Sequence, residues 1–385
     1  MKKIEAYTGY EMGPIRPPSE ANSLLIRVTR NCPWNRCTFC PVYKDEKFSR
    51  RPLDHVLQDI DTLHHYVTTL LDTQKSGNRM TTWRELAGQS HPDDALDRTA
   101  YYTARNFVAH GMQSVFLQDG NSLNIKPHDL VRILKRLKEA FPEIKRITSY
   151  ARSKTVAKIE DEDLRRIADA GLNRIHIGME SGSDKVLEAV KKGSDKATQI
   201  LAGQKVKRAG MELSEYIIPG LGGRTLSREH ALESADALNQ INPDFIRLRT
   251  LALPDGAPLT SQYREGHFDK MGDIETTQEL LLFLESLRGI TSSVKSDHTL
   301  NLFTEVEGRL PDDRGHMIAP LQEFLQLDRH EQMVFCIGRR THRLAHLSDL
   351  NNPVRRGYAE QICHELGATP ETMDGIIDTI MKQFI

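Results

Sequence analysis

Strand-like and helix-like segments alternate along this chain from about residue 23 to residue 250. Six predicted strands cover residues 23–30, 113–118, 146–152, 173–179, 213–218 and 244–250. Helical patterns separate them at residues 127–141, 162–171, 183–193 and 227–240. Such alternation is typical of βαβ units, so the sequence predicts an α/β fold with a parallel sheet.

Several predicted strands carry polar side chains on one face. In the fourth strand the polar face carries Arg174, His176 and Glu180, and in the sixth it carries Arg247 and Arg249. A complete eight-stranded barrel fills its interior with branched apolar residues, which these polar faces do not provide. The pattern therefore favours an open, partial (β/α)6 barrel with a polar central cavity.

Two regions lie outside the alternation. Residues 51–112 form an insertion with helical stretches at 51–71 and 97–112 and a predicted loop at 72–92. After about residue 265 the strand-helix rhythm stops, and mainly helical segments follow. We expect a barrel domain at residues 1–265, including the helical insertion, and a mainly helical C-terminal cap at residues 266–385.

Composition excludes several classes of protein. The 385 residues include 52 Lys+Arg and 53 Asp+Glu, and a net charge of −1 gives no global attraction for nucleic acid. The N-terminus lacks an apolar signal segment, and the longest apolar run, residues 280–284, is too short to span a bilayer. We therefore expect a cytoplasmic protein without a membrane partner, for which nucleic acid is not the expected partner.

Three of the five cysteines lie within nine residues, directly after the first predicted strand. Cys32, Cys37 and Cys40 form a C-x4-C-x2-C pattern. A structural zinc site uses four protein ligands, whereas an iron-sulfur cube held by three thiolates leaves one iron open for another ligand. The pattern favours an iron-sulfur cluster; a zinc site and three unrelated thiols are the alternatives.

The cysteine segment resembles that of the radical S-adenosylmethionine (radical SAM) superfamily, whose usual loop is C-x3-C-x-aromatic-C. Phe39 stands at the aromatic position, although the first spacing here is four residues instead of three. The segment GMESGS is similar to the G-x-E-S-G-S segment of radical SAM enzymes with this type of barrel, and FLQDGNSL and LSEYIIPGLGG resemble segments of an uncharacterised group in that superfamily. The resemblance implies a TIM-like partial barrel, a [4Fe-4S] cluster on the three cysteines, and S-adenosylmethionine (SAM) bound to the open iron.

The resemblance also implies which residues contact SAM, on segments at the ends of the predicted strands. A glycine-containing turn after the second strand would hold the methionine amino group, Arg152 its carboxylate, and Glu180 the ribose hydroxyls. Helix capping is an alternative role for Ser181, an ordinary turn for the second segment, and a tight loop for the glycines. The implied cofactor-binding residues are Phe39, Asp119, Gly120, Asn121, Tyr150, Arg152, Glu180, Ser181 and Gly220.

Polar residues on the strand faces are the candidates for catalysis on the substrate. They are His176, Arg247, Arg249 and one of the adjacent pair Glu215 and Tyr216. A salt-bridge network inside the barrel is the alternative role for them. The resemblance implies reductive cleavage of SAM to methionine and a 5′-deoxyadenosyl radical, which abstracts hydrogen from an unidentified substrate. It further implies a low-potential electron donor such as flavodoxin or ferredoxin; an iron-sulfur electron-transfer or sensing protein is the alternative class.

Overall fold

The computed structural model describes residues 5–75 and 95–382, and within them the chain forms a mostly parallel sheet with helices. The strand order is β1-β4-β5-β6-β7-β8-β9-β10. β4 pairs in parallel with β1 and β5, and β8 with β7 and β9, whereas β10 is antiparallel to β9. The strands are β1 (Leu24–Arg27), β4 (Ser114–Gln118), β5 (Arg146–Ala151), β6 (Arg174–Glu180), β7 (Glu212–Ile217), β8 (Phe245–Leu248), β9 (Ser293–Lys295) and β10 (Gly308–Arg309).

The chain divides into two compact units, and the division falls within β6. Unit 1 consists of Met1–Pro33, Asp45–His176 and Lys205–Glu212. Unit 2 consists of Trp34–Lys44, Ile177–Gln204 and Leu213–Ile385. These units are defined by contacts within the chain and do not test the expected boundary between barrel and cap at residue 265. That boundary stays a prediction.

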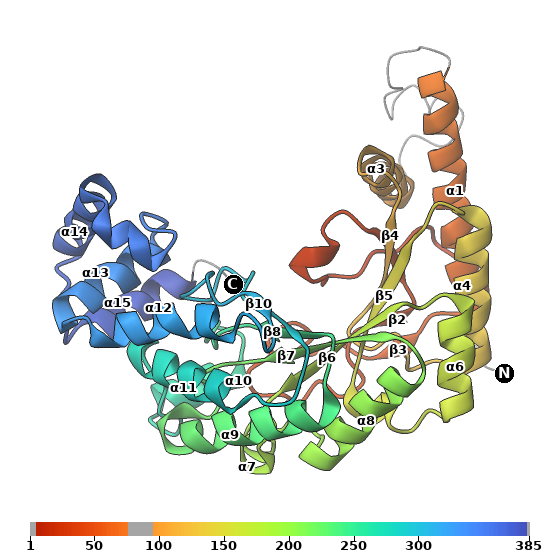
Figure 1. The fold of residues 1–385 in the computed structure, drawn as a ribbon. Helices are drawn as coiled ribbons and strands as arrows, with labels where there is room; N and C mark the ends of the chain where they lie inside the picture. Colours follow the sequence, from red (N-terminus) through yellow and green to blue (C-terminus); the bar gives the residue numbers. More distant parts are fainter. Residues whose placement is uncertain (1–4, 76–94, 383–385) are drawn as a thin grey trace. The chain divides into compact units, whose positions relative to one another are not determined.

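In unit 1, α1, α4 and α6 follow one another along strands β4 and β5 (Figure 1). A further helix of the insertion region, α3, packs against α1 and β1. A short antiparallel pair, β2 (Thr29–Arg30) with β3 (Ser49–Arg50), leads into α1. The helices of this unit are η1 (Pro18–Glu20), α1 (Leu53–Lys75), α3 (Ala95–Ala109), α4 (Pro127–Ala140), α5 (Ser153–Val156) and α6 (Asp161–Ala170).

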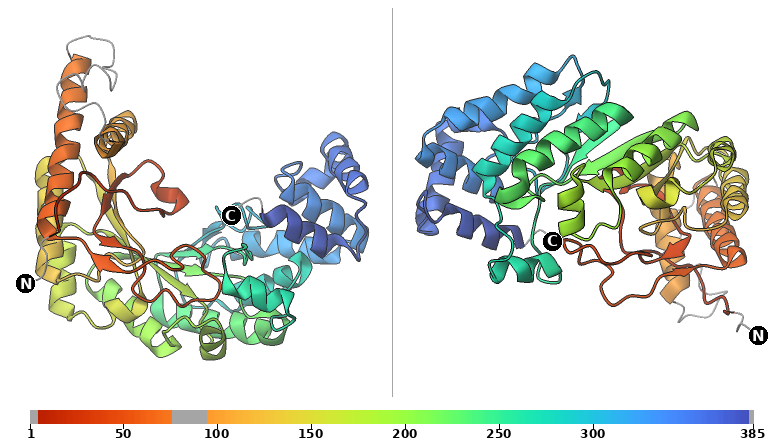
Figure 2. Two further views of the ribbon diagram at one scale, coloured as in Figure 1. Left: turned by 180° about the vertical axis from the view of Figure 1, so that it is seen from behind. Right: turned by 90° about the horizontal axis from the view of Figure 1, so that it is seen from below.

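Unit 2 has one core that joins the strands to the C-terminal helices. Ile217 of β7 and Ile246 of β8 belong to the same buried cluster as Leu238 of α9 and Phe335 of α13. Figure 2 shows the C-terminal helices grouped beside α11, against which α12 packs. The helices are α7 (Asp184–Ala189), α8 (Lys196–Arg208, whose last residues belong to unit 1), α9 (Gly223–Ile241), α10 (Pro258–Arg264), α11 (Asp273–Ser286), α12 (Arg314–Gln326), α13 (Arg329–Arg340), η2 (Leu347–Asn351), α14 (Pro353–Glu365) and α15 (Met373–Met381).

The predicted fold class is confirmed, and all six predicted strands are present. The sheet nevertheless has more strands than expected, because β9 and β10 are added to it. Both strands lie in the region that was predicted to form the C-terminal cap. These strands have three and two residues, too few for a period-two pattern to be visible in the sequence. The predicted loop at 72–92 lies mostly outside the described residues.

Helix α8 was not predicted, and its central residue Gly203 gives the reason. Glycine is a poor helix former, which weakens the helical signal of this segment. A Cβ atom at Gly203 would lie 2.7 Å from Cγ2 of Ile241 and 3.1 Å from Cδ2 of Leu213. The glycine therefore allows α8 to approach α9 and β7 closely. No helix among the described residues is long and apolar enough to cross a membrane.

We predict opposite effects for two glycine substitutions inside helices. Gly203→Val should destabilise the protein by about 1–3 kcal/mol, because the added atoms overpack the contact with Ile241. Gly357→Ala should stabilise it by about 0.5–1 kcal/mol, because Gly357 of α14 is exposed and nothing lies within 4 Å of an added Cβ. Chemical denaturation of both variants measures the two effects, and equal effects would contradict the packing argument.

Candidate active site

The predicted cofactor-binding residues follow the carboxyl ends of the strands. Asp119 directly follows β4, Arg152 directly follows β5, and Glu180 is the last residue of β6. Gly220 lies three residues after the end of β7. Parallel α/β proteins bind their ligands at this edge of the sheet, so the elements that position these residues suit a binding site.

In unit 1, a buried carboxylate fixes the start of the cysteine loop. Asp119 is fully buried and accepts hydrogen bonds from Arg27, with Nη2 at 2.7 Å and Nε at 3.1 Å. The same carboxylate accepts the backbone N–H of Asn31 at 3.3 Å. Asn31, which precedes Cys32, has a φ of 65°, a left-handed conformation that asparagine tolerates. The structure therefore gives Asp119 a positioning contact with the cysteine loop.

Asn121 joins the turn after β4 to the turn after β5. Its Oδ1 accepts the backbone N–H of Arg152 at 3.0 Å, and its Nδ2 donates to Oγ1 of Thr155 at 2.8 Å. Gly120, which lies between Asp119 and Asn121, is half-buried, and so is Arg152 at the start of α5. These bonds hold the two turns together and fix the orientation of the Asn121 amide.

His176 lies in a buried cluster within unit 1. Its ring centroid is 5.8 Å from that of Tyr150, which stands edge-on to Phe116. Nε2 of His176 is 3.8 Å from Oε1 of the buried Glu20. Burial would raise the pKa of Glu20, but the nearby His176 ring, the hydrogen bond from Ser23 and the charge of Arg146 outweigh burial and lower it. His176 thus lies beside an ionised carboxylate.

In unit 2, the cysteine loop is attached to the end of α7. The N–H of Thr38 donates to the carbonyl of Val190 at 2.9 Å, and the indole N–H of Trp34 donates to the carbonyl of Lys191 at 2.7 Å. The Trp34 ring packs over Gly193, where an added Cβ would lie 2.3 Å from the indole. Because Gly193 also has a φ of +69°, this turn requires glycine.

The three clustered cysteines fit an iron-sulfur cluster by the chemistry of their side chains. Cys32, Cys37 and Cys40 are half-buried, and none forms a disulfide bond. The ammonium group of Lys44 donates to the carbonyl of Cys37 at 2.9 Å and so helps to fix the loop backbone. Among residues 5–75 and 95–382, no group of three His, Cys, Asp or Glu side chains is gathered as a metal site. Three soft thiol ligands on one anchored loop are nevertheless the donor set that an iron-sulfur cluster requires.

A buried ion pair lies beside Phe39. Nζ of Lys192 is 2.9 Å from Oε1 of Glu180 and 5.8 Å from the centroid of the Phe39 ring. Lys192 is only 8% exposed, so solvent screens this pair weakly. Glu180 has a φ of 66°, a strained conformation for a non-glycine residue that is more frequent at functional sites. Sequence reasoning missed Lys192, because its proximity to Glu180 depends on the length of α7.

Ser181 and Gly220 are held by buried residues that the sequence did not single out. The Ser181 hydroxyl is 2.8 Å from Nδ1 of His230 and accepts the N–H of Ser183 at 3.0 Å. Helix capping was the alternative role for Ser181, but the residue that caps α7 is Ser183, whose hydroxyl accepts the N–H of Val186 at 3.3 Å. The N–H of Gly220 donates to Oε1 of Glu279 at 2.7 Å.

The structure separates the adjacent pair Glu215 and Tyr216. Tyr216 is opposite Arg247 in the β7-β8 register, so these two side chains share one face. Glu215 is opposite Ile246, which packs in the core with residues of α9. Glu215 therefore lies on the helix-covered side, and only Tyr216 accompanies Arg247 on the other face.

The two arginines of the sixth strand have different surroundings. Arg247 is 5% exposed, and its Nη1 donates to Oδ2 of Asp297 at 2.8 Å. This ion pair is of the kind expected if the polar strand residues form a salt-bridge network inside the barrel, which was the alternative to a catalytic role. Arg249 lies just beyond β8 and is exposed.

Glu215 is a buried carboxyl group without a hydrogen-bond partner for either oxygen among the described residues. Burial raises its pKa well above the ordinary value, and the negative charge of Glu180 raises it further, although Lys192 opposes this. Burial thus favours the protonated, neutral form of Glu215. Its position on the helix-covered side makes it a determinant of stability more than of substrate contact.

Residues 26–235 match the sequence model of the Radical SAM superfamily. The match covers more than half of the chain, and the chain belongs to this superfamily. It is therefore an enzyme of a class that uses a [4Fe-4S] cluster and SAM.

Two curated relatives are archaeal enzymes named tRNA uridine(34) acetyltransferase. The relative from Methanocaldococcus infernus is 20% identical over 286 residues, with 71% of this chain and 51% of the relative covered. The relative from Methanocaldococcus jannaschii is 18% identical over 290 residues, with 71% and 50% covered. The chain thus spans about half the length of these relatives.

Two solved structures with similarity to this chain are those of methylornithine synthase and an archaeal Elp3. Methylornithine synthase superposes with a TM-score of 0.42 at 15% identity, covering 77% of this chain and 69% of the synthase. The Methanocaldococcus infernus Elp3 with an N-terminal deletion superposes with a TM-score of 0.41 at 17% identity, covering 56% of this chain and 55% of that protein.

We predict that Glu215→Gln changes how stability depends on pH. In the wild type the folded state keeps a proton on Glu215 that the unfolded state loses above its ordinary pKa. The free energy of unfolding should therefore fall, relative to that of the variant, as the pH rises between these two pKa values. The slope should reach about 1.4 kcal/mol per pH unit.

Denaturation between about pH 5 and pH 8 measures this difference. Glu188→Gln is the control, because Glu188 is exposed on α7. A constant difference between wild type and Glu215→Gln over this range would mean that Glu215 is ionised in the folded protein.

Proposed function

We propose that this enzyme cleaves SAM reductively and uses the resulting 5′-deoxyadenosyl radical to abstract hydrogen from a substrate C–H bond. The observation that carries the proposal is the attachment of the cysteine loop to the end of α7, the same segment that supplies Lys192 to Glu180. Within unit 2, the segment after α7 thus supports both the loop that carries Cys37 and Cys40 and the carboxylate of Glu180. An electron carrier would not need this coupling.

Cys32, Cys37 and Cys40 are the proposed ligands of the [4Fe-4S] cluster. When bound, the cluster supplies one electron that splits SAM into methionine and the adenosyl radical. The hydrogen bonds of Thr38 and Trp34 to the α7 end keep the loop backbone fixed, so that little reorganisation accompanies binding. Asp119 contributes from the other end of the loop through Asn31.

Glu180 is the proposed acceptor for the ribose hydroxyls of SAM. A carboxylate has several lone pairs, and only one oxygen of Glu180 is engaged by Lys192 at 2.9 Å. Lys192 orients this carboxylate, and the Phe39 ring shields the pair on one side. The strained backbone at Glu180 supports a role in binding, because strain of this kind has to be compensated by the surrounding structure.

The remaining proposed cofactor contacts have narrower roles. Gly120 has no side chain to cover its backbone at the turn after β4, where Asn121 fixes the geometry, and the Arg152 guanidinium is a planar partner for the methionine carboxylate. Tyr150 contributes an apolar ring beside this turn. Ser181 and Gly220 position the segments after β6 and β7 through His230 and Glu279.

For the substrate, we propose that Tyr216, Arg247 and Arg249 line its site, with His176 as a further candidate. Tyr216 and Arg247 share a face of the sheet, and Arg249 is exposed at the strand end. Guanidinium groups favour a substrate with a carboxylate or phosphate group. The reaction needs a low-potential electron donor, for which flavodoxin or ferredoxin is proposed.

We predict that Cys37→Ala abolishes the reaction by removing a cluster ligand. Anaerobically reconstituted wild type should carry four iron atoms per chain and release 5′-deoxyadenosine when reduced with SAM. The variant should lose both properties. Cys363→Ala is the matched control, because Cys363 is buried in α14 and should not affect the cluster.

Iron analysis, the visible absorption spectrum and chromatography of the products measure these outcomes. An intact cluster in the wild type without 5′-deoxyadenosine would support the electron-transfer or sensing alternative. Stoichiometric zinc in place of iron would contradict both the radical reaction and the electron-transfer or sensing alternative, because each requires an iron-sulfur cluster.

We predict that Glu180→Gln weakens SAM binding by about 10-fold to 100-fold while the cluster is retained, because charge-assisted hydrogen bonds to the ribose are lost. Equilibrium dialysis against the reconstituted protein measures the affinity. Glu233→Gln is the control, since Glu233 also pairs with a lysine, Lys196, but its side chain is 44% exposed on α9, compared with 14% for Glu180. Equal affinities for all three proteins would contradict the assignment of Glu180.

A further inference from the structure

The N-terminal segment of unit 1 is tied to β1 and β4. We call residues 5–15 the N-terminal strap. The buried Tyr10 of the strap donates its hydroxyl to the carbonyl of Leu25 in β1 at 2.7 Å. The side-chain amide of Gln118, the last residue of β4, donates to two carbonyls of the strap and accepts the N–H of Gly13 at 2.9 Å. These contacts attach the strap to both strands.

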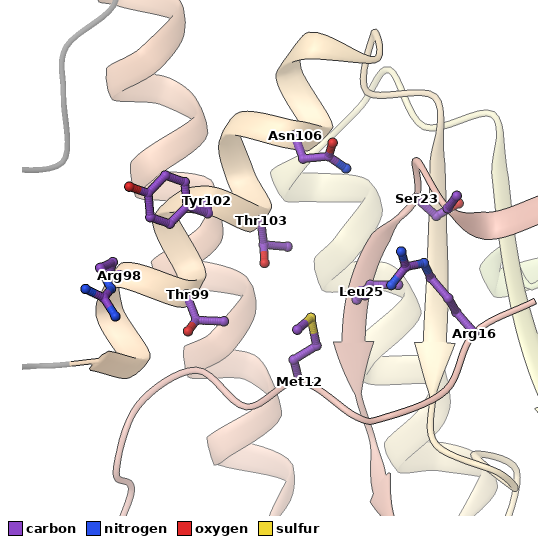
Figure 3. A pocket seen from close by; sticks show the side chains of 10 residues that line it. Met12, Arg16, Ser23, Leu25, Arg98, Thr99, Tyr102, Thr103 and Asn106 are labelled. Carbon is purple, nitrogen blue, oxygen red and sulfur yellow. The ribbon is translucent and has the colours of Figure 1, made fainter. Parts of the chain in front are cut away.

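The strap is not closely packed on every side. Figure 3 shows Met12 of the strap at a cavity that lies between the strap, β1 and α3. The volume of this cavity is about 550 Å³, and Met12 is 44% exposed. Because the cavity leaves this part of the strap without close packing toward α3, polar contacts have a larger share in fixing its position.

Glu11 of the strap binds three arginines. Its Oε1 is 2.7 Å from Nη1 of Arg27, and its Oε2 is 2.8 Å from Nη2 of Arg30 and 3.3 Å from Nε of Arg51. The Nε–H of Arg30 also donates to both oxygens, at 2.8 and 2.9 Å. Burial would raise the pKa of Glu11, but the hydrogen bond from Arg30 and the charges of all three arginines outweigh burial and lower it. Glu11 is thus a carboxylate held in one place by three cations.

Two of these arginines connect the strap to the first cysteine of the loop. Arg30 is separated from Cys32 only by Asn31. Arg27 donates its Nη2–H groups to Asp119 at 2.7 Å and to Oδ1 of Asn31 at 3.2 Å, and Asp119 in turn accepts the backbone N–H of Asn31. The strap carboxylate therefore acts by two routes on the backbone directly before Cys32.

The strap also covers Asp119. A Cβ atom at Gly13 would lie 3.1 Å from both oxygens of this carboxylate, and Asp119 is completely buried. The carboxylate is thus enclosed by the strap and by the guanidinium group of Arg27. In this position it holds the start of the cysteine loop.

Each of the three arginines has a second acidic partner. The pairs are Arg27 with Asp119, Arg30 with Glu5, and Arg51 with Asp59. Loss of the charge of Glu11 therefore leaves no buried arginine without a counter-charge, which would be strongly destabilising. The strap also keeps its contacts through Tyr10 and Gln118. A variant without this charge should consequently fold, but it lacks the one carboxylate that all three arginines share.

We propose that Glu11 is a positioning residue for the iron-sulfur cluster, and that it holds Cys32 in place through Arg30 and Arg27. The proposal rests on the proposed function, in which Cys32 is one of the three cluster ligands. Glu11 itself contacts neither the cluster nor SAM. Residues that orient metal ligands from outside have a large influence on metal affinity.

The test compares Glu11→Gln with the wild type in the rate at which an iron chelator removes the reconstituted cluster under anaerobic conditions. The decay of the visible absorption of the cluster measures this rate. Loss of a residue that orients a metal ligand costs about 10-fold to 100-fold in affinity, and because Glu11 acts through two arginines we expect about 10-fold faster loss. The electron paramagnetic resonance (EPR) spectrum of the reduced cluster with SAM should also differ, since it reports the geometry around the iron.

Glu5→Gln is the matched control, because Glu5 pairs with the same Arg30 but its side chain is 47% exposed, compared with 24% for Glu11. This variant should leave both readouts unchanged. Glu11→Asp keeps the charge and should restore part of the resistance to the chelator. Denaturation of the apoproteins separates positioning from stability, and Glu11→Gln and Glu5→Gln should unfold at the same denaturant concentration.

The proposal is overturned if Glu11→Gln loses its cluster no faster than the wild type or if Glu5→Gln loses it equally fast. It is also overturned if the apoprotein of Glu11→Gln unfolds at a correspondingly lower denaturant concentration, because the effect is then one of stability. A wild type that takes up no iron-sulfur cluster would contradict the proposed function and this proposal together. A wild type that holds the cluster without forming 5′-deoxyadenosine would contradict only the radical reaction, and the chelator test would still decide the role of Glu11.

Discussion

The attachment of the cysteine loop to the end of α7 is the constraint on which the candidate active site depends. A loop that contributes three metal ligands loses much of its conformational entropy, and hydrogen bonds that exist before the metal arrives reduce this cost. Here the loop backbone donates a hydrogen bond to the carbonyl of Val190, and the Trp34 indole donates one to the carbonyl of Lys191. Gly193 has no side chain and so leaves room for the indole ring. Lys192 stands between these contacts and turns toward Glu180.

The same logic extends to other residues that the resemblance marks as SAM contacts. Asp119, Asn121, Ser181 and Gly220 are each engaged by a neighbouring residue of the protein. Several residues that the sequence marks as ligand contacts therefore also act as supports. Such double use is expected where a binding site needs side chains locked in one orientation.

The sequence predicted the fold class and six of the strands because their hydrophobic periodicity is strong and local. It did not predict β9 and β10, because these strands are very short. It did not predict α8, because Gly203 weakens the helical pattern and is needed only for the close contact with Ile241. For the site, cysteine spacing and short motifs identified the segments. Lys192, His230 and Glu279 escaped because each meets its partner through tertiary packing that no local pattern records. The choice between Glu215 and Tyr216 likewise required the β7-β8 register.

The continuous core of unit 2 limits how this chain can be rearranged. Strand residues such as Ile246 share their apolar environment with Phe324 and Phe335 of the C-terminal helices. Cutting the chain after the sixth barrel strand would leave that apolar surface in water, at a cost of about 25 cal/mol for each Å² exposed. The C-terminal helices thus complete the apolar core beneath strands β7 and β8, and a shortened chain would have to bury these strands in another way.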